Sequence, residues 1–123
     1  MATEYCLYGW DDRAPHKWYG EGYQSNVWEV GREREKLHPT LKPQELLTKF
    51  ICNSSRREDV VFDGFAGSCS VLICCEKLQR ICYCVEIDEY FCDTAVRRYI
   101  KLAPGKVFDE IKQKYMLTGD QNE

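Results

Sequence analysis

The stretch that most constrains the fold is a short apolar run followed by a turn of small residues. Val60-Val61-Phe62 is wholly apolar and lies between a charged segment and the glycine-rich turn from Asp63 to Ser70. A run this short, with no polar position, predicts a strand buried inside a parallel sheet. Small residues where a chain leaves the carboxyl end of such a strand allow a ligand to approach the backbone.

The segments around this strand alternate between helical and extended patterns. The order helix, strand, glycine-rich turn, helix, strand, acidic residue describes a nucleotide-binding βαβ unit in an α/β fold. The expected helices are Pro43 to about Cys52, Val71 to Leu78, Glu89 to about Leu102 and a stretch from Val107 to Tyr115. The expected strands are Thr3 to Tyr8, Asn26 to Val30, Val60 to Phe62 and Ile81 to Val85.

Length and charge set the broad class. With 123 residues and 44% apolar residues, the chain is expected to form one domain. Within it we distinguish 1–37 (a strand and an aromatic loop), 38–103 (the βαβ core) and 104–123 (a tail). A net charge of −3 argues against a free-standing electrostatic nucleic-acid binder. The absence of a long apolar run and of a signal-like start predicts a cytoplasmic protein without a membrane span.

The eight cysteines predict neither a disulfide framework nor a metal site. No Cys-x-x-Cys pair occurs, and His16 and His38 are not spaced to complete a zinc site. Most of the cysteines lie inside apolar segments, as Cys74-Cys75 does. We therefore expect reduced, buried thiols that pack as small hydrophobic side chains.

The glycine-rich turn indicates the class of ligand. It has neither the Gly-x-Gly-x-x-Gly pattern of dinucleotide sites nor the Gly-Lys-Ser/Thr of a phosphate loop. Glu86 follows Asp63 by 86 − 63 = 23 residues, which suits a carboxylate that accepts ribose hydroxyls. A nucleoside ligand without a phosphate chain, such as S-adenosylmethionine, fits best. The simpler alternatives are a structural turn and an ordinary carboxylate at a strand end.

Three segments in order resemble the amino-group DNA methyltransferases, which modify adenine N6 or cytosine N4. The segment 63–69 (DGFAGSC) is similar to their Asp-Pro-Phe-x-Gly-Ser-Gly cofactor loop. The segment 38–43 (HPTLKP) matches their His-Pro-Thr-x-Lys-Pro, and 85–90 (VEIDEY) resembles their Glu-x-Asp-x-x-Tyr. Segments between 4 and 28 resemble phage and prophage members, so the resemblance covers about Thr3 to Tyr99.

The resemblance implies a Rossmann-like S-adenosylmethionine-dependent methyltransferase fold and a role for individual residues. The loop would hold the methionine part of the cofactor, Glu86 the ribose, and Ile87 or Asp88 would border the adenine. The segment at 38–42 would close over the cofactor's carboxylate, with Thr40 as a donor and Lys42 as a counter-charge. The expected cofactor-binding residues are His38, Pro39, Thr40, Lys42, Asp63, Gly64, Phe65, Ala66, Gly67, Ser68, Glu86 and Asp88.

The departures from the family pattern are as informative as the matches. Gly64 stands where proline is usual and Cys69 where the last glycine is usual. The catalytic Asp-Pro-Pro-Tyr box, whose aromatic ring stacks on the flipped base, does not occur in the sequence. We therefore assign no catalytic residue and expect an incomplete parallel or mixed sheet, in which Val60 to Phe62 presents a two-sided apolar edge. DNA would be the substrate of the completed enzyme, formed as a homodimer or with a chain carrying the box.

Other interpretations stay open at this stage. The chain is alternatively a non-catalytic S-adenosylmethionine-binding or assembly module, or a decayed prophage remnant. The aromatic residues Trp10, Trp18, Tyr19, Tyr23 and Trp28 either anchor an irregular loop to the core or form a base-stacking surface. We interpret Arg97 and Arg98 as the basic end of a helix.

Overall fold

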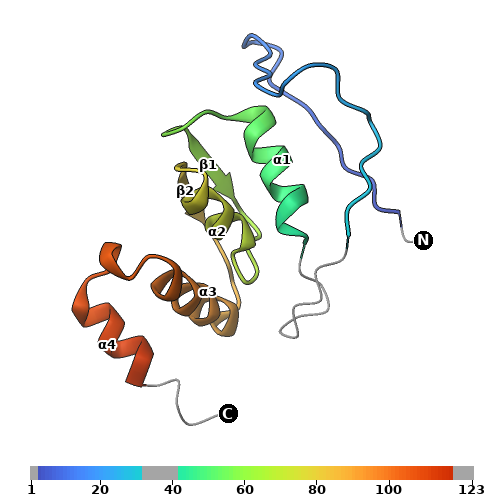
Figure 1. The fold of residues 1–123 in the computed structure, drawn as a ribbon. Helices are drawn as coiled ribbons and strands as arrows, with labels where there is room; N and C mark the ends of the chain where they lie inside the picture. The colour runs from blue at the N-terminus through green and yellow to red at the C-terminus, as the bar shows by residue number, and fades with distance from the viewer. Residues whose placement is uncertain (1–2, 32–41, 118–123) are drawn as a thin grey trace.

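The centre of the molecule is a pair of parallel strands. The computed structural model describes residues 3–31 and 42–117 (Figure 1). In it β1 (Val60–Asp63) pairs with β2 (Ile81–Cys84), with Val60 opposite Ile81 and Asp63 opposite Cys84. Because the strands run in the same direction, their carboxyl ends meet at one edge of the sheet.

Helices follow each strand, as the alternating pattern predicts. α1 (Gln44–Ser54) precedes β1, α2 (Ser70–Lys77) joins β1 to β2, and α3 (Glu89–Leu102) follows β2. A turn of 3-10 helix, η1 (Pro104–Lys106), leads into α4 (Asp109–Leu117). Apart from η1, which the sequence does not predict, each of these helices and strands lies within about two residues of its expected position. Of the helices in residues 3–31 and 42–117, none is long and apolar enough to cross a bilayer.

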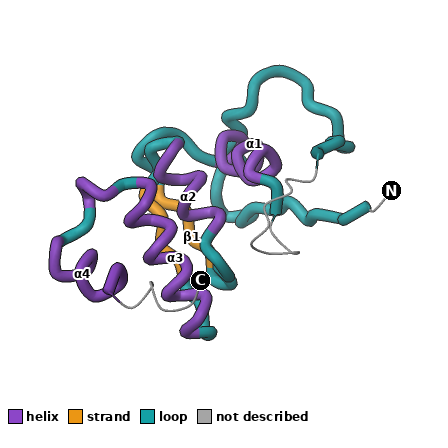
Figure 2. Tube along the Cα trace, turned by 60° about the horizontal axis from the view of Figure 1, so that its bottom comes forward, coloured by secondary structure: helices purple, strands orange, loops and turns teal. Residues whose placement is uncertain are grey.

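The three main helices cover the same face of the sheet. α2 lies over the two strands and packs against both α1 and α3 (Figures 1 and 2). One core cluster consists of Ile51, Cys74 and Cys75, with Val61 and Cys82 from the sheet packed against it. A second cluster, in which Ala95 of α3 is buried with Leu72 of α2 and Cys84 of β2 packed nearby, places α3 on the same side of the sheet.

The cysteines supply much of this core. All eight are free thiols, and those at 69, 74 and 75 are buried. Burial raises the pKa of Cys69, Cys82 and Cys84 to about 12, so these thiols stay protonated and pack as small apolar groups. The prediction of burial is wrong for Cys6, a free thiol that is exposed in the N-terminal segment.

The strands are half-buried, which corrects the expectation of strands buried on both faces. Val61 and Cys82 face the helices, whereas Val60, Phe62 and Tyr83 are each at least 60% exposed on the opposite face. The predicted two-sided apolar edge is therefore one-sided. The physical reason is that α1, α2 and α3 all pack on the same face, and no described segment covers the other.

The N-terminal segment 3–31 contains no helix or strand, so the strands expected at 3–8 and 26–30 are wrong. It lies along α1 instead (Figure 1). The Tyr19 amide donates to the Asn53 carbonyl (2.8 Å), and the side-chain amides of Gln24 and Asn53 exchange two hydrogen bonds of 2.9 Å. The Trp28 ring packs on Phe50 at 5.3 Å between centroids. These contacts to helix side chains and carbonyls take the place of a strand partner.

A glycine allows this close approach, which leads to a test. A Cβ atom on Gly20 would lie 2.3 Å from Asn53 Oδ1, whereas one on Gly9 would meet nothing within 4 Å. We expect Gly20→Ala to lower the free energy of unfolding by about 1 to 3 kcal/mol, because the buried Asn53 must move. Urea denaturation checks this, with Gly9→Ala as the matched control. Equal stability of the two variants would contradict the described packing against α1.

Candidate functional site

The glycine-rich turn lies at the carboxyl edge of the sheet and is held there by backbone hydrogen bonds. The Val85 amide donates to the Asp63 carbonyl (2.9 Å), and the Ala66 amide donates to the Val85 carbonyl (3.1 Å). The Asp63 carboxylate accepts from the Phe65 amide at 3.1 Å, which fixes the first bend of the turn. The turn after β1 is therefore attached to the segment that follows β2.

The Glu86 carboxylate completes this attachment. Its Oε2 accepts a 2.6 Å hydrogen bond from the Gly67 amide, and its Oε1 accepts bonds of 2.9 Å from the amides of Ile87 and Asp88. These donors, that of Asp88 most of all, hold the pKa of Glu86 below its usual value. Glu86 remains ionised at neutral pH and joins two segments that the sequence separates by 19 residues.

Arg98 of α3 supports the other end of the turn, a role that the sequence analysis missed. Its Nη1 donates to the Ser68 carbonyl (2.6 Å) and lies 3.1 Å from Ser68 Oγ and 3.3 Å from Ser70 Oγ. The pattern of α3 predicts only a basic helix end. The partner of Arg98 lies 30 residues away, so nothing local in the sequence signals the contact.

Two residues of the turn adopt left-handed backbone conformations. Gly67 has φ +53°, which glycine adopts without a steric penalty. Cys69 has φ 58° and ψ 43° at the N-cap of α2. This conformation gives a physical reason for glycine at the equivalent family position, since a side chain in it costs about 1–2 kcal/mol. Cys69 adopts it with its side chain buried in the core beside Cys84.

The remaining residues predicted to bind the cofactor lie in several different environments. Phe65 is 97% exposed, whereas Ala66 is buried beneath the turn. Asp88 caps α3, its Oδ1 accepting from the Tyr90 amide at 2.9 Å. Lys42 lies before α1 and forms an exposed ion pair with Glu4. His38, Pro39 and Thr40 lie outside the described residues.

Most aromatic residues of the loop fall into two groups, whereas Tyr23 is fully exposed and does not anchor the loop. Tyr19 and Trp28 contact α1, as the anchoring interpretation predicts. In the second group, Trp10 stacks on His16 at 4.1 Å, and Tyr8 donates to or accepts from His16 Nε2 at 2.9 Å. Tyr8 and Trp10 are 51% and 59% exposed, so this group packs mainly on itself. Its use as a base-stacking surface stays a prediction.

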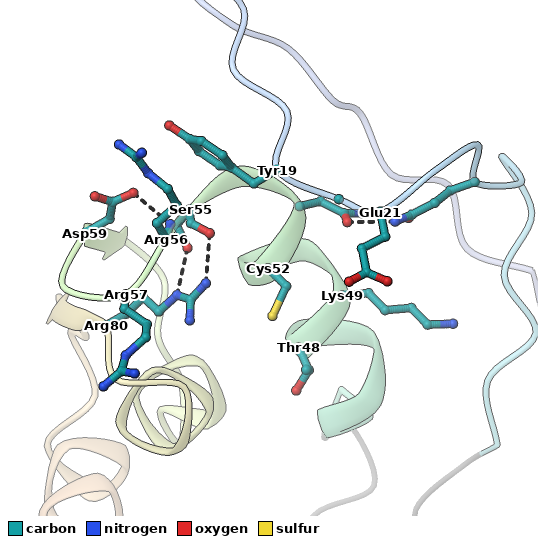
Figure 3. A pocket seen from close by; sticks show the side chains of 13 residues that line it. Tyr19, Glu21, Thr48, Lys49, Cys52, Ser55, Arg56, Arg57, Asp59 and Arg80 are labelled. Carbon is teal, nitrogen blue, oxygen red and sulfur yellow. Dashed lines mark hydrogen bonds between the residues drawn. The ribbon is translucent and has the colours of Figure 1, made fainter.

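A separate cavity lies on the other side of the molecule. A pocket of about 850 Å³ lies between the N-terminal segment and the end of α1, and Figure 3 shows the side chains that line it. Arg80 is one of the lining residues and donates to the Ser55 carbonyl (2.8 Å). The Arg56 guanidinium lies 5.0 Å from the centre of the Tyr19 ring. Asp59 and Arg80 directly precede the two strands, so this pocket lies at the sheet edge opposite the glycine-rich turn.

The described residues contain no cluster of three or more His, Cys, Asp or Glu side chains suited to a metal ion. The polar groups gathered at the carboxyl edge are instead backbone amides, two serines and the carboxylates of Asp63 and Glu86. Such a set suits an organic ligand with hydroxyl and ammonium donors.

The conformation of the turn can be tested with a pair of glycine variants. At Gly67 an added Cβ would meet no atom within 4 Å, but the residue that carries it would have to keep a positive φ. At Gly64 an added Cβ would contact only the exposed Phe62 ring, at 3.3 Å. We expect Gly67→Ala to lower the free energy of unfolding by about 1 kcal/mol and Gly64→Ala by less than about half of that. Urea denaturation of both variants measures the difference. A larger loss for Gly64→Ala would contradict the described turn.

The chain is similar in sequence to known methyltransferases. A family model described as DNA methylase (N6_N4_Mtase) matches residues 10–97. The type II methyltransferase M.HpaI of Haemophilus parainfluenzae is 31% identical over 113 residues, covering 83% of this chain and 35% of that enzyme. M2.MboI of Moraxella bovis is 32% identical over 100 residues, covering 77% and 36%. The chain thus spans about a third of the length of these relatives.

Solved structures share the fold. The chain resembles the M1.HpyAVI–SAM complex with a TM-score of 0.53 and 25% identity, covering 67% of this chain and 44% of that one. It also resembles the cytosine-N4-specific PvuII DNA methyltransferase (TM-score 0.51, 22% identity, covering 64% and 27%), a likeness of fold alone. With its parallel strands, glycine-rich turn and strand-end carboxylate, the chain belongs to the N6/N4 DNA methylase family and has the α/β fold of S-adenosylmethionine-dependent methyltransferases.

Proposed function

We propose that these residues form the S-adenosylmethionine-binding part of a DNA amino-methyltransferase acting on adenine N6 or cytosine N4. The observation that carries the proposal is the Glu86 carboxylate, which attaches the glycine-rich turn to the carboxyl end of β2. The solved M1.HpyAVI structure is a complex with SAM, the curated relatives are type II methyltransferases, and the matching family model is described as DNA methylase, which supports the choice of ligand and substrate.

The residues at this edge fit that cofactor. A carboxylate offers about four acceptor positions, of which backbone amides use three at Glu86. The remaining position is available to a ribose hydroxyl. One oxygen of Asp63 accepts from the Phe65 amide, and the other can receive the ammonium of the methionine part. The open space beside Gly67 lets a ligand approach the backbone.

The other assignments form part of the same proposal. Thr40 and Lys42, with His38 and Pro39, would close over the cofactor's carboxylate, and Ile87 or Asp88 would border the adenine. Lys42 would then exchange its exposed partner Glu4 for the ligand, a change that costs little because such pairs contribute at most about 1 kcal/mol.

In the proposed reaction these residues bind and orient but do not touch the target base. The bound cofactor supplies an activated methyl group. Asp63, Gly67 and Glu86 fix its position, which is the part of the rate enhancement that depends on alignment. The base-binding Asp-Pro-Pro-Tyr box does not occur in these 123 residues, so we propose that they bind cofactor but need a box-carrying segment to methylate DNA. We also propose that the enzyme is of phage or prophage type and acts in the cytoplasm.

Titration with S-adenosylmethionine tests the proposal directly. We expect micromolar affinity, about −8 kcal/mol, by isothermal titration calorimetry. Glu86→Gln should weaken binding at least tenfold, because an amide places a donor among the three backbone N–H groups. The matched control is Glu89→Gln, which removes the same charge from the first turn of α3 without touching the turn.

The outcomes separate the proposed function from its alternative. Binding that is weakened by Glu86→Gln but changed less than twofold by Glu89→Gln supports the assigned site. Folded protein that gives no heat at millimolar cofactor would overturn the proposal and favour a decayed remnant. Equal affinity of wild type and Glu86→Gln would place the cofactor elsewhere.

A further inference from the structure

The pocket at the sheet edge opposite the glycine-rich turn has a local excess of positive charge that the cofactor site does not explain. Its ionisable lining consists of four basic and two acidic side chains: Lys49, Arg56, Arg57, Arg80, Glu21 and Asp59. The whole chain has a net charge of −3, so the sign of the charge is reversed here. The volume of about 850 Å³ lies in the range of sites for small molecules. A concave basic surface on an acidic chain indicates an anionic ligand.

The two carboxylates of the pocket do not neutralise its arginines. Figure 3 shows the three arginines together at one end of the pocket and Glu21 at the other end. Asp59 lies near the arginines, but its Oδ2 accepts a 2.7 Å hydrogen bond from the Arg56 backbone amide. Within residues 3–31 and 42–117, no ion pair joins either carboxylate to an arginine of the pocket.

Two of the three guanidinium groups keep their N–H donors available. The Arg56 guanidinium lies 5.0 Å from the centre of the Tyr19 ring, a contact with the ring face that uses no hydrogen bond. Among the described residues, the Arg57 guanidinium has no hydrogen-bond or ion-pair partner. Arg80 differs, because three of its nitrogens donate to Ser55 and to one further carbonyl at 2.6 to 3.2 Å. Arg80 is thus part of the wall, whereas Arg56 and Arg57 can bind a ligand.

We propose that this pocket binds a small phosphorylated molecule, whose phosphate accepts hydrogen bonds from Arg56 and Arg57. The site is separate from the cofactor edge, and the inference does not depend on the proposed function. A guanidinium presents a planar fork of donors that matches two oxygens of a phosphate group. Two adjacent guanidinium groups therefore suit a doubly charged phosphate ester better than a singly charged carboxylate. The half-buried Tyr19 and Cys52 also line the pocket and offer contacts to the organic part of the ligand.

The segment that carries the two arginines is held in place by its backbone. The Asp59 amide donates to the Arg56 carbonyl (3.2 Å), and the Glu58 amide donates to the Gln79 carbonyl (2.7 Å). Glu58 and Gln79 both have left-handed conformations, with φ 67° and 60°. Residues other than glycine keep such a conformation only where the surrounding structure enforces it. Arg56 and Arg57 thus project from a fixed turn, whose backbone needs no ordering when a ligand binds.

The place of the pocket in the fold favours a small molecule over DNA. Asp59 and Arg80 directly precede the two strands, whereas the glycine-rich turn follows β1. A strand of four residues spans about 13 Å. A duplex bound at this edge would therefore hold its bases away from the proposed cofactor site. A small molecule can occupy the pocket while the cofactor edge stays free.

Titration with uridine monophosphate tests the inference, with uridine as the ligand that lacks the phosphate. The pyrimidine base avoids the adenine of the proposed cofactor. The variant is Arg57→Gln, which removes an exposed charge without a partner among the described residues. The matched control is Arg13→Gln, which removes the same charge from an exposed ion pair with Asp11 outside the pocket. Calorimetry gives the affinities, and ¹H–¹⁵N NMR shows which amides shift and that each variant is folded.

We expect uridine monophosphate to bind the wild-type chain with a Kd of about 0.1 to 1 mM, and uridine at least about tenfold more weakly. Arg57→Gln should weaken binding of the phosphate ester by at least about fivefold and Arg13→Gln by less than about twofold, because only Arg57 would contact the phosphate. The amide signals of Gly20 and Arg57 should shift, and that of Gly67 should not. Saturating S-adenosylmethionine should leave the affinity unchanged.

Several results would overturn the inference. Absence of binding at about 10 mM uridine monophosphate is one, since so weak a site has no use for its arginines. Equal affinity for uridine, or equal weakening by both variants, would show that the phosphate does not contact Arg57. Displacement by S-adenosylmethionine together with a shifted Gly67 amide would place the ligand at the cofactor edge. A short DNA duplex that displaces uridine monophosphate and binds more tightly would make DNA the partner. Failure of S-adenosylmethionine to bind, with the other results as expected, would contradict the proposed function alone.

Discussion

The hydrogen bonds between the Glu86 carboxylate and three backbone amides connect the parts of the proposed site. Along the chain, α2 and β2 separate the turn after β1 from the segment after β2. The amides of Gly67, Ile87 and Asp88 nevertheless all donate to one carboxylate. A negative charge among convergent N–H groups is stabilised without a cationic partner. The same carboxylate that would receive a ribose hydroxyl therefore also shapes the backbone that surrounds the ligand.

The second constraint is the direction of the strand–helix connections. Because the helices that pack on β1 and β2 lie on one face, the molecule has a well-packed side, where Cys74, Cys75 and Ile51 are buried, and an open side. The cofactor edge lies between these sides, at the carboxyl ends of the strands. One face is thus stabilised by the chain's own helices, and the other is exposed in the part of the chain that the structure describes.

Much of this arrangement could be predicted from the sequence, because local patterns determine it. The order of elements could be predicted from the run Val60 to Phe62, the small residues after it and the periodicity of α3. The spacing of Asp63 and Glu86 predicts that the two carboxylates lie at the same edge of the sheet. Contacts between distant residues could not be predicted, as Arg98 with Ser68 shows. The prediction of a strand at 3–8 was wrong for a similar reason. Strand formation depends on pairing with a neighbouring strand, which the local sequence does not determine.

A pH titration of the backbone amides by ¹H–¹⁵N NMR tests the central role of Glu86 most directly. The pKa of Glu86 is lowered in the folded state, so its stabilisation is complete above the ordinary value of 4.5 and is lost as the pH falls through the lower folded-state value. The amide signals of Gly67, Ile87 and Asp88 should therefore shift together, with one midpoint below 4.5. A Gly67 amide that does not follow the other two, or a midpoint at or above 4.5, would contradict the account.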